Sequence, residues 1–524
     1  MKKFSFLFLL AALTVSCDLL DICRKSGEVV DVTGDALHGM IVLGEKLEDP
    51  YSVDVMTKAL ASVYPTKSRI PLTPTDLYVR FLPDGQDQFD RLEAMGLQLV
   101  DHPVDYRIVR EGDYYHDPEI EEGNITWQYT VVGKDFNFPS GIRYEILDEC
   151  YISDNDPATK ADGLDWEEVE REAYRLSGNS DMLAETKGGG GTTATPEGRI
   201  TIIDDLKGED PAGVKGVRVS CNSFVKFASA YTDKDGNYRM SKSFSTDVRY
   251  RLVFKNSKGF SIGFNLLLVP ASTSSLGKGS PEGVNATIDK YSENKLFTRA
   301  VVNNAGYDYY ESCIVDDGSR MRTPPGNLRI WLFRGLDCSS AVMLQQGAVI
   351  DKSKLASYLG EFASLLKMFL PDITLGLKGA EDFCEIYSTT VHEMAHASHF
   401  MQVGKDYWNK YINFIIKSFI TSGFVTYGVG TEEDHGYCEV GEMWAYYLEN
   451  VFYRERYGAE FLSGTSYWFY PQILMFLDER GIGRYKIFNA LTSDITDRDL
   501  LEKKLVSLYP ECKSMINQAF SRYR

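Results

Sequence analysis

Two histidines and a glutamate are the residues of this chain most suited to chemistry. Residues 389–397 read TTVHEMAHA, which places His392 and His396 four positions apart with Glu393 beside the first. On a helix, positions four apart differ by roughly 40° around the axis, so both imidazoles can share one metal ion. Zn²⁺ accepts such nitrogens and keeps one position for water in catalytic sites. We expect Glu393 to act on that zinc-activated water as general base and then general acid.

A third ligand must come from elsewhere in the chain. Residues 439–447 read EVGEMWAYY, with an apolar stripe typical of a packed helix. Glu442 with Ala445 resembles the Glu-x-x-Ala signature of the gluzincins, zinc metallopeptidases in which a Glu of a following helix completes the site. The resemblance implies that Glu442 binds Zn²⁺ together with the two histidines. Glu439, one turn earlier, stays open as an alternative ligand or a supporting acid.

A related zinc pattern fits less well. Metzincins place Gly three residues and His six residues after the second histidine, whereas this chain has His399 and Gln402 there. Hydrolysis also needs a hydrogen-bond donor to the developing oxyanion. His435, Tyr437 and Tyr446 lie before or within the Glu442 helix and are the candidates.

These residues require a mainly helical region to position them. Apolar spacing predicts helices over 383–401 and 407–420, and strands at 326–333 and 372–378. The resemblance to gluzincins at 392–397 and at Glu442 implies that residues 290–524 form a zincin-like metallopeptidase domain of mainly helical α+β type.

A β-sandwich is expected before that region. Residues 187–196, KGGGGTTATP, are typical of a flexible linker within a boundary segment at 181–197. Short strands separated by turns follow over 198–270, with Asp235-Gly236 as a hairpin turn. GVRV at 216–219 and AYTDKDGNY at 230–238 resemble the carboxypeptidase regulatory-like, or transthyretin-like, sandwich. That resemblance implies an all-β fold and carries no catalytic residues.

Residues 49–180 predict a small α+β domain. Strands are expected at 77–82, 97–100 and 126–132, with a helix at 87–95. The predicted fold class is thus multi-domain: a small α+β N-terminal domain, an all-β sandwich middle domain and the zincin-like C-terminal domain.

The N-terminus predicts export and anchoring. Two lysines precede an apolar run over 4–15, which is too short to span a bilayer and is typical of a signal peptide. LTVSC at 13–17 resembles a bacterial lipobox, so residues 1–17 would be a lipoprotein signal and Cys17 the lipidated first residue of a tether over 18–48. The expected location is the bacterial cell envelope, as a lipoprotein of the outer membrane facing the periplasm or the surface. A secreted protein without lipid is the alternative.

Charge and cysteine content limit the partners. With 75 acidic against 56 basic residues the net charge is −19, which disfavours nucleic acid as a partner. Eight cysteines besides Cys17 would allow disulfides in an oxidising compartment, with pairing undetermined. The sequence therefore predicts a lipid-anchored zinc metalloendopeptidase acting on a peptide or protein substrate. A surface-anchored binding or scaffold protein with a vestigial or structural zinc site is the alternative function.

Overall fold

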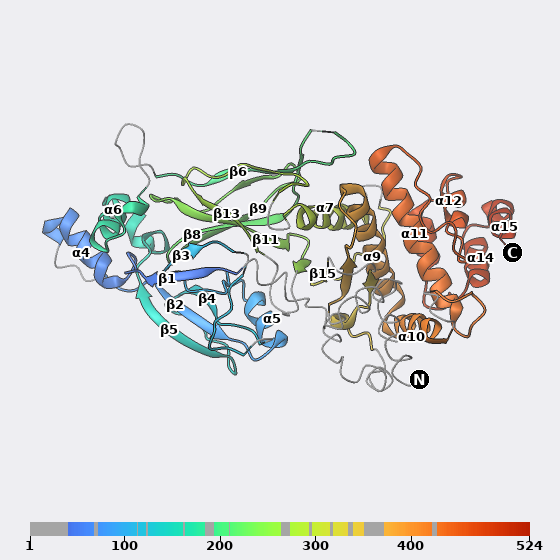
Figure 1. Cartoon of the computed structure of the whole chain (residues 1–524), viewed down its shortest axis with the longest axis horizontal. Coiled ribbons are helices and arrows are strands. Elements are labelled where there is room, and N and C mark those ends of the chain that lie inside the picture. The colour runs from blue at the N-terminus through green and yellow to red at the C-terminus, as the bar shows by residue number, and fades with distance from the viewer. Residues whose placement is uncertain are drawn as a thin grey trace, which may run out of the picture.

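The computed structural model describes residues 40–67, 72–112, 114–121, 124–160, 163–183, 193–208, 210–263, 273–292, 296–314, 318–333, 339–349, 371–421 and 427–523. Within these ranges the chain is an α+β protein with several β-sheets and 11 α-helices, consistent with the predicted multi-domain build. The molecule is elongated, with the N-terminal elements at one end, a strand-rich region in the middle and a helical region at the other end (Figure 1).

The N-terminal region contains two small antiparallel sheets and three helices. Its elements are β1 (Val42–Lys46), α4 (Val53–Val63), β2 (Asp76–Leu82), α5 (Gln86–Ala94), β3 (Tyr106–Arg110), β4 (Gln128–Gly133), β5 (Arg143–Cys150) and α6 (Trp166–Leu176). β1 pairs with β3, and β2 is the central strand between β4 and β5. Val79 and Phe81 are two positions apart on β2, so their side chains lie on the same face of the sheet. Leu92 of α5 packs against them on that face.

The strand-rich region contributes to two further sheets. Its strands are β6 (Glu197–Ile202), β7 (Ala212–Gly213), β8 (Val217–Ser223), β9 (Lys226–Tyr231), β10 (Asn237–Arg239), β11 (Val248–Asn256), β12 (Ser261–Gly263), β13 (Thr273–Gly279) and β14 (Ala286–Ile288). β6 pairs with β10, β14 and β7 in a four-stranded sheet, whereas β8, β9, β11, β12 and β13 belong to an eight-stranded sheet.

The turn at Asp235-Gly236 is confirmed, but the prediction that it closes a hairpin is wrong. It connects β9 of the eight-stranded sheet to β10, which pairs with β6 of the other sheet. Gly236 has a φ of +85°, and a Cβ there would lie 2.1 Å from the carbonyl oxygen of Ile200. The close approach to β6, rather than a tight hairpin, therefore requires glycine at this position.

The larger sheet continues into the helical region. β12 pairs in parallel with β15 (Arg329–Phe333), which pairs in parallel with β17 (Ile373–Gly376), and β16 (Ser340–Ala341) completes this edge. The sheet thus crosses the domain limits expected at residues 270 and 290, and one hydrophobic core contains both Leu252 and Trp444. The domain limits stay predictions.

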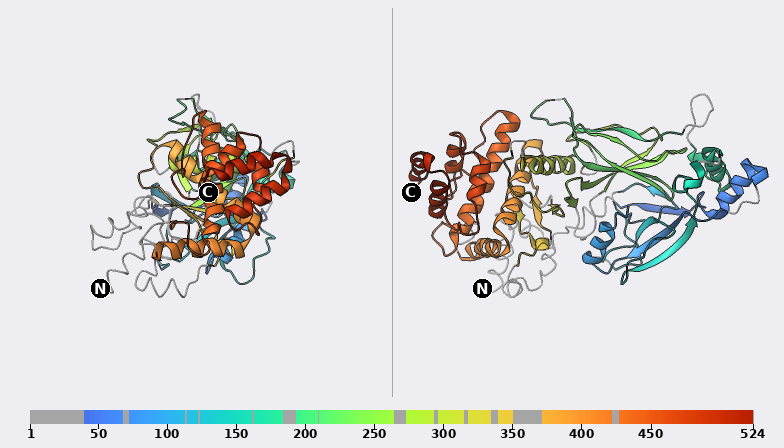
Figure 2. Two further views of the ribbon diagram at one scale, coloured as in Figure 1. Left: turned by 90° about the vertical axis from the view of Figure 1, so that its right-hand side faces the viewer. Right: turned by 180° about the vertical axis from the view of Figure 1, so that it is seen from behind.

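The helical region packs against the end of this sheet. Its helices are α7 (Leu296–Ser312), α9 (Phe383–Val403), α10 (Lys405–Thr421), α11 (His435–Tyr457), α12 (Gln472–Asp478), α13 (Arg484–Ala490), α14 (Arg498–Leu508) and α15 (Lys513–Ser521). α9 lies between α7 and α11, α12 and α14 pack against the outer side of α11, and α15 packs against α12 and α14 (Figures 1 and 2). α9 and α11 are the two helices that carry the expected ligands.

Most predicted elements in the described residues are confirmed. The segments at 77–82, 87–95, 383–401 and 407–420 are β2, α5, α9 and α10. The strand predicted at 97–100 is wrong, because only Val100 forms a bridge, to Tyr129. Leu97 and Leu99 instead pack against the core under β2, and that packing explains their apolar pattern.

Several predictions concern residues outside the described ranges. The signal peptide, Cys17 and residues 18–39 of the tether lie there, as does most of the Gly-rich linker. Among the helices that are described, none is both long and apolar enough to cross a membrane. The six cysteines in the described ranges are free thiols: Cys150, Cys221, Cys313, Cys384, Cys438 and Cys512.

Candidate metal centre

The histidine pair lies in the middle of α9, which neighbouring elements cover along most of its length. Val391, Met394 and Ala395 are fully buried, and His392 and His396 are buried beside them. The helix ends where Gly404 adopts a φ of +81°. As the spacing predicts, the two imidazole rings lie on one side of the helix, with their centroids 4.8 Å apart.

Glu442 of α11 faces both histidines. Nε2 of His392 lies 3.5 Å from Oε2 of Glu442, and Nε2 of His396 lies 3.6 Å from Oε1. The two Nε2 atoms are 3.2 Å apart. One ligand atom from each of the three residues lies within 4.8 Å of the others, so two separate helices bring their donors to one point.

The separation of the two histidine nitrogens fits a tetrahedral metal ion. Ligand atoms about 2.0–2.1 Å from Zn²⁺ lie about 3.3 Å from one another at tetrahedral angles. The 3.2 Å between the two nitrogens matches that value, and each nitrogen lies 3.5 or 3.6 Å from a different oxygen of Glu442, so the carboxylate spans both histidines. Two imidazoles and one carboxylate are also the donor set of three-ligand catalytic zinc sites. The three residues could therefore hold a metal ion.

Two further side chains orient the expected ligands. Nδ1 of His392 lies 3.1 Å from Oε2 of Glu449, which fixes the ring so that Nε2 points at Glu442. The hydroxyl of Tyr411, on α10, donates a hydrogen bond to Oε1 of Glu442. A carboxylate behind a ligand histidine is a common support of metal sites, because it holds the ring and makes its free nitrogen more basic.

The charges of the site favour a cation. Burial alone would lower the pKa of His392, but its hydrogen bonds to Glu442 and Glu449 outweigh burial and raise that pKa well above its usual value. Burial alone would raise the pKa of Glu442, but the two histidines lower it. For His396 burial prevails and lowers the pKa, which favours the neutral imidazole that binds metals.

Glu393 is buried beside these residues. Only 4% of it is exposed, and its Oε2 has no hydrogen-bond partner among the described residues. Burial raises the pKa of Glu393 to about 8, with repulsion from Glu442 and Glu449 adding to the rise and His392 opposing it. An acid whose pKa lies near neutrality is suited to both accept and donate a proton.

Glu439, the alternative ligand, is engaged elsewhere. Its Oε2 accepts a hydrogen bond of 2.9 Å from the backbone N of Arg498, and its Oε1 lies 3.3 Å from Nε of that residue. It is therefore paired at the start of α14, whereas Glu442 faces the histidines.

Two of the three candidate oxyanion donors, Tyr446 and His435, differ in whether they contact a predicted ligand. Tyr446 packs its ring 4.4 Å from that of His392, and its hydroxyl lies 3.4 Å from the hydroxyl of Tyr427. The contacts of His435 within the described ranges are with the carbonyl of Glu432, at 2.7 Å, and the ring of Trp468. The structure thus brings Tyr446, but not His435, against a predicted ligand.

Sequence reasoning missed Glu449 and Tyr411. Glu449 carries a usable signal, because it lies seven residues after Glu442 and so on nearly the same face of α11. Tyr411 lies on α10 and carries no comparable signal, since its place beside Glu442 depends on how two helices pack. Comparison of the whole chain with protein-family models, with curated proteins and with solved structures finds no match.

Proposed function

We propose that this protein is a zinc-dependent metallopeptidase that hydrolyses peptide bonds in a peptide or protein substrate. The observation that carries the proposal is the convergence of His392, His396 and Glu442 within 4.8 Å in a buried site. Glu393 supports it, because a buried acid without a hydrogen-bond partner for one oxygen lies next to the first of these residues.

The number of ligands favours catalysis over a structural zinc site. Structural zinc sites use four protein ligands, whereas catalytic sites use three and leave one position for water or substrate. In the part of the chain that the structure describes, the group at this site has three members. A structural or vestigial zinc site in an anchored scaffold protein activates no water, so it would not need Glu393 as a general base.

Each residue of the site would have its own role in peptide hydrolysis. When bound, Zn²⁺ would lower the pKa of a water ligand and polarise the carbonyl of the scissile peptide bond. Glu393 would accept a proton at its carboxylate during attack and return one to the leaving amine. Glu449 would hold His392 in place through Nδ1, and Tyr411 would hold the carboxylate of Glu442.

Three broader expectations remain part of the proposal. The placement of Glu442 against both histidines supports a gluzincin-type site, and the strand-rich region supports the regulatory-like β-sandwich. Anchoring through a lipid on Cys17 in the bacterial envelope rests on the sequence at 13–17 alone.

Zinc content and peptide cleavage test the proposal together. The purified protein should contain one zinc per chain by mass spectrometry of metals and should cleave members of a mixed peptide library. Glu393→Gln should keep the zinc and lower the cleavage rate by about 10²–10⁴-fold. His396→Ala should lose both zinc and cleavage.

Glu439→Gln is the matched control, because it removes a buried carboxylate one turn from Glu442 that is paired with Arg498. It should keep zinc and cleavage. Cleavage that is unchanged in Glu393→Gln would refute the assigned role, and a wild-type protein without zinc would refute the metal centre. Tightly bound zinc with no cleavage of any library peptide would favour the scaffold protein instead.

A further inference from the structure

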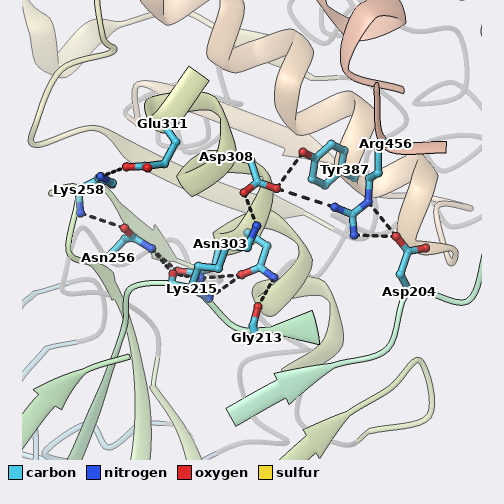
Figure 3. Close-up of polar contacts among 11 residues, drawn as sticks. Asp204, Gly213, Lys215, Asn256, Lys258, Asn303, Asp308, Glu311, Tyr387 and Arg456 are labelled. Atoms are coloured by element: carbon cyan, nitrogen blue, oxygen red, sulfur yellow. Dashed lines mark hydrogen bonds and ion pairs between the residues drawn. The ribbon is translucent and has the colours of Figure 1, made fainter. Parts of the chain in front are cut away.

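Two neighbouring aspartates in the turn after β6 contact both helices of the metal centre. Asp204 is buried, and its Oδ2 lies 2.7 Å from Nη2 and 2.8 Å from Nε of Arg456, near the C-terminal end of α11 (Figure 3). The hydroxyl of Tyr457 also lies 3.2 Å from this oxygen. The last turn of α11 is thus tied to the strand-rich region by a charged pair.

Asp205 holds the start of α9. Its Oδ1 accepts a hydrogen bond of 3.1 Å from the backbone N of Phe383, the first residue of the helix. Asp382, the residue in the N-cap position, makes no side-chain capping bond of its own. Asp205 therefore caps α9 from another segment, and its negative charge suits the positive end of the helix dipole.

A second link joins the same helix ends through α7. The hydroxyl of Tyr387, on α9, donates to Oδ2 of Asp308 at 3.0 Å, and Nη1 of Arg456 lies 3.8 Å from the same oxygen (Figure 3). Oδ1 of Asp308 lies 2.6 Å from Nζ of Lys215, between β7 and β8. The guanidinium of Arg456 also stacks on Tyr387, 4.6 Å from the ring centroid.

The geometry of the two helices explains why these contacts matter. His392 lies nine residues after Phe383 on α9, and Glu442 lies 14 residues before Arg456 on α11. At 1.5 Å per residue these are about 14 Å and 21 Å along straight helices. Asp205 holds the start of α9, and the adjacent Asp204 holds the end of α11. Because both belong to the turn after β6, the two helices resist sliding past each other. A shift of about 1 Å would disturb an assembled site.

We propose that Asp204 and Asp205 are positioning residues for the metal centre. They make the strand-rich region a clamp that sets the relative placement of α9 and α11, and so of His392, His396 and Glu442. The inference rests on the proposed function for its effect on metal binding, whereas its effect on the two helices holds with or without a metal.

The first measurement uses metal-free protein and amide hydrogen exchange. Asp204→Asn should speed exchange in the last turns of α11, and Asp205→Asn should speed exchange in the first turn of α9. Arg456→Lys is a milder variant that keeps the charge but loses the planar guanidinium, for use where Asp204→Asn does not fold.

Glu455→Gln is the matched control. It neutralises the neighbouring carboxylate on α11, which pairs with Arg484 of α13 at 2.9 Å and forms no hydrogen bond or ion pair with the β6 turn among the described residues. It should leave exchange in α9 unchanged.

The second measurement is zinc affinity, by competition with a chromophoric chelator well below the unfolding temperature. Asp204→Asn and Asp205→Asn should each weaken zinc binding by about tenfold, the lower end of effects for residues that support metal ligands. Co²⁺-loaded protein should change its visible spectrum in these variants, because ligand geometry sets that spectrum. A purely structural role would lower the unfolding midpoint and leave the affinity and the spectrum unchanged.

The outcomes separate the two proposals. Faster exchange together with weaker zinc binding supports the clamp. Unchanged exchange at the helix ends, or faster exchange with unchanged affinity, overturns it. A wild-type protein that binds no zinc refutes the metal centre, and the exchange measurement then still shows whether the aspartates hold the two helices.

Discussion

The molecule contains two buried clusters of charged residues that differ in how they are neutralised. Between the N-terminal and strand-rich regions, Glu170 of α6 accepts hydrogen bonds from Tyr51 at 2.7 Å and from Ser245 at 3.2 Å, and it pairs with Lys226 at 2.9 Å. Lys226 also pairs with Asp154 at 3.0 Å. Burial alone would lower the pKa of Lys226, but the two carboxylates outweigh burial and raise it. This cluster supplies its own cation.

The cluster between α9 and α11 has only its two imidazoles to balance its acids. Glu393, Glu442 and Glu449 are buried around two imidazoles, and no lysine or arginine contacts them within the described ranges. A buried charge without a partner is costly, so a cluster of acids without lysine or arginine is suited to bind a cation. The Glu170 cluster, which contains Lys226, is thus suited to stabilise the fold, whereas the cluster between α9 and α11, which contains no lysine or arginine, is suited to hold a metal ion.

Removing the built-in cation is expected to have the largest effect. Lys226→Met should lower the free energy of unfolding by about 3–5 kcal/mol, because it leaves Glu170 buried without its charge partner. Urea unfolding followed by circular dichroism measures the loss. The double variant with Glu170→Gln should recover much of it, since neither charge then remains. An equal loss in single and double variants would show that this cluster does not act as a pair.

The buried Asp49, close to the Glu170 cluster, has no built-in cation among the described residues, and the pH dependence of stability tests what its burial costs. Asp49 accepts a hydrogen bond from the backbone N of Tyr51 at 2.9 Å, and burial raises its pKa to about 7. The folded state therefore binds this proton more tightly than the unfolded state, whose pKa lies near 3.8. The stability that results is fully present below pH 3.8 and is lost as the pH rises through about 7.

Asp49→Asn should remove this part of the pH dependence. Between pH 4 and 7 the unfolding free energy of the wild type should fall relative to the variant by a few kcal/mol, as urea titrations at several pH values would measure. The exposed Asp54→Asn serves as the control and should follow the wild type. Parallel curves for Asp49→Asn and the wild type would contradict the assignment.

The smallest expected effect concerns the support of the metal centre. Glu449→Gln should weaken zinc binding by about 10- to 100-fold, because His392 loses the carboxylate that orients its ring. Its unfolding free energy without metal should change less than that of Lys226→Met, since removing an acid from a cluster of acids also relieves repulsion. Isothermal titration with Zn²⁺ and urea unfolding measure both quantities. A Glu449→Gln protein with unchanged zinc affinity would show that this contact is incidental.

Much of the candidate site follows from local sequence. The spacing of His392 and His396 predicts their common side on a helix, and the extent of that helix is confirmed to within a few residues, 383–403 against the expected 383–401. Likewise, the apolar stripe around Glu442 predicts a packed helix, which is α11. These predictions succeed because helix periodicity depends on residues only a few positions apart.

The rest was decided by packing between distant segments. Glu439 and Glu442 lie three residues apart, about 60° around the helix, so either could have faced the histidines. The rotation of α11 against α9 turns Glu442 toward the two histidines. Glu439 instead pairs with Arg498 at the start of α14. Tyr411 and the Asp204–Asp205 turn also reach the site or its helices from other elements. A sequence pattern sets which face of a helix is apolar, whereas the partner of that face and its angle depend on contacts formed across the whole chain.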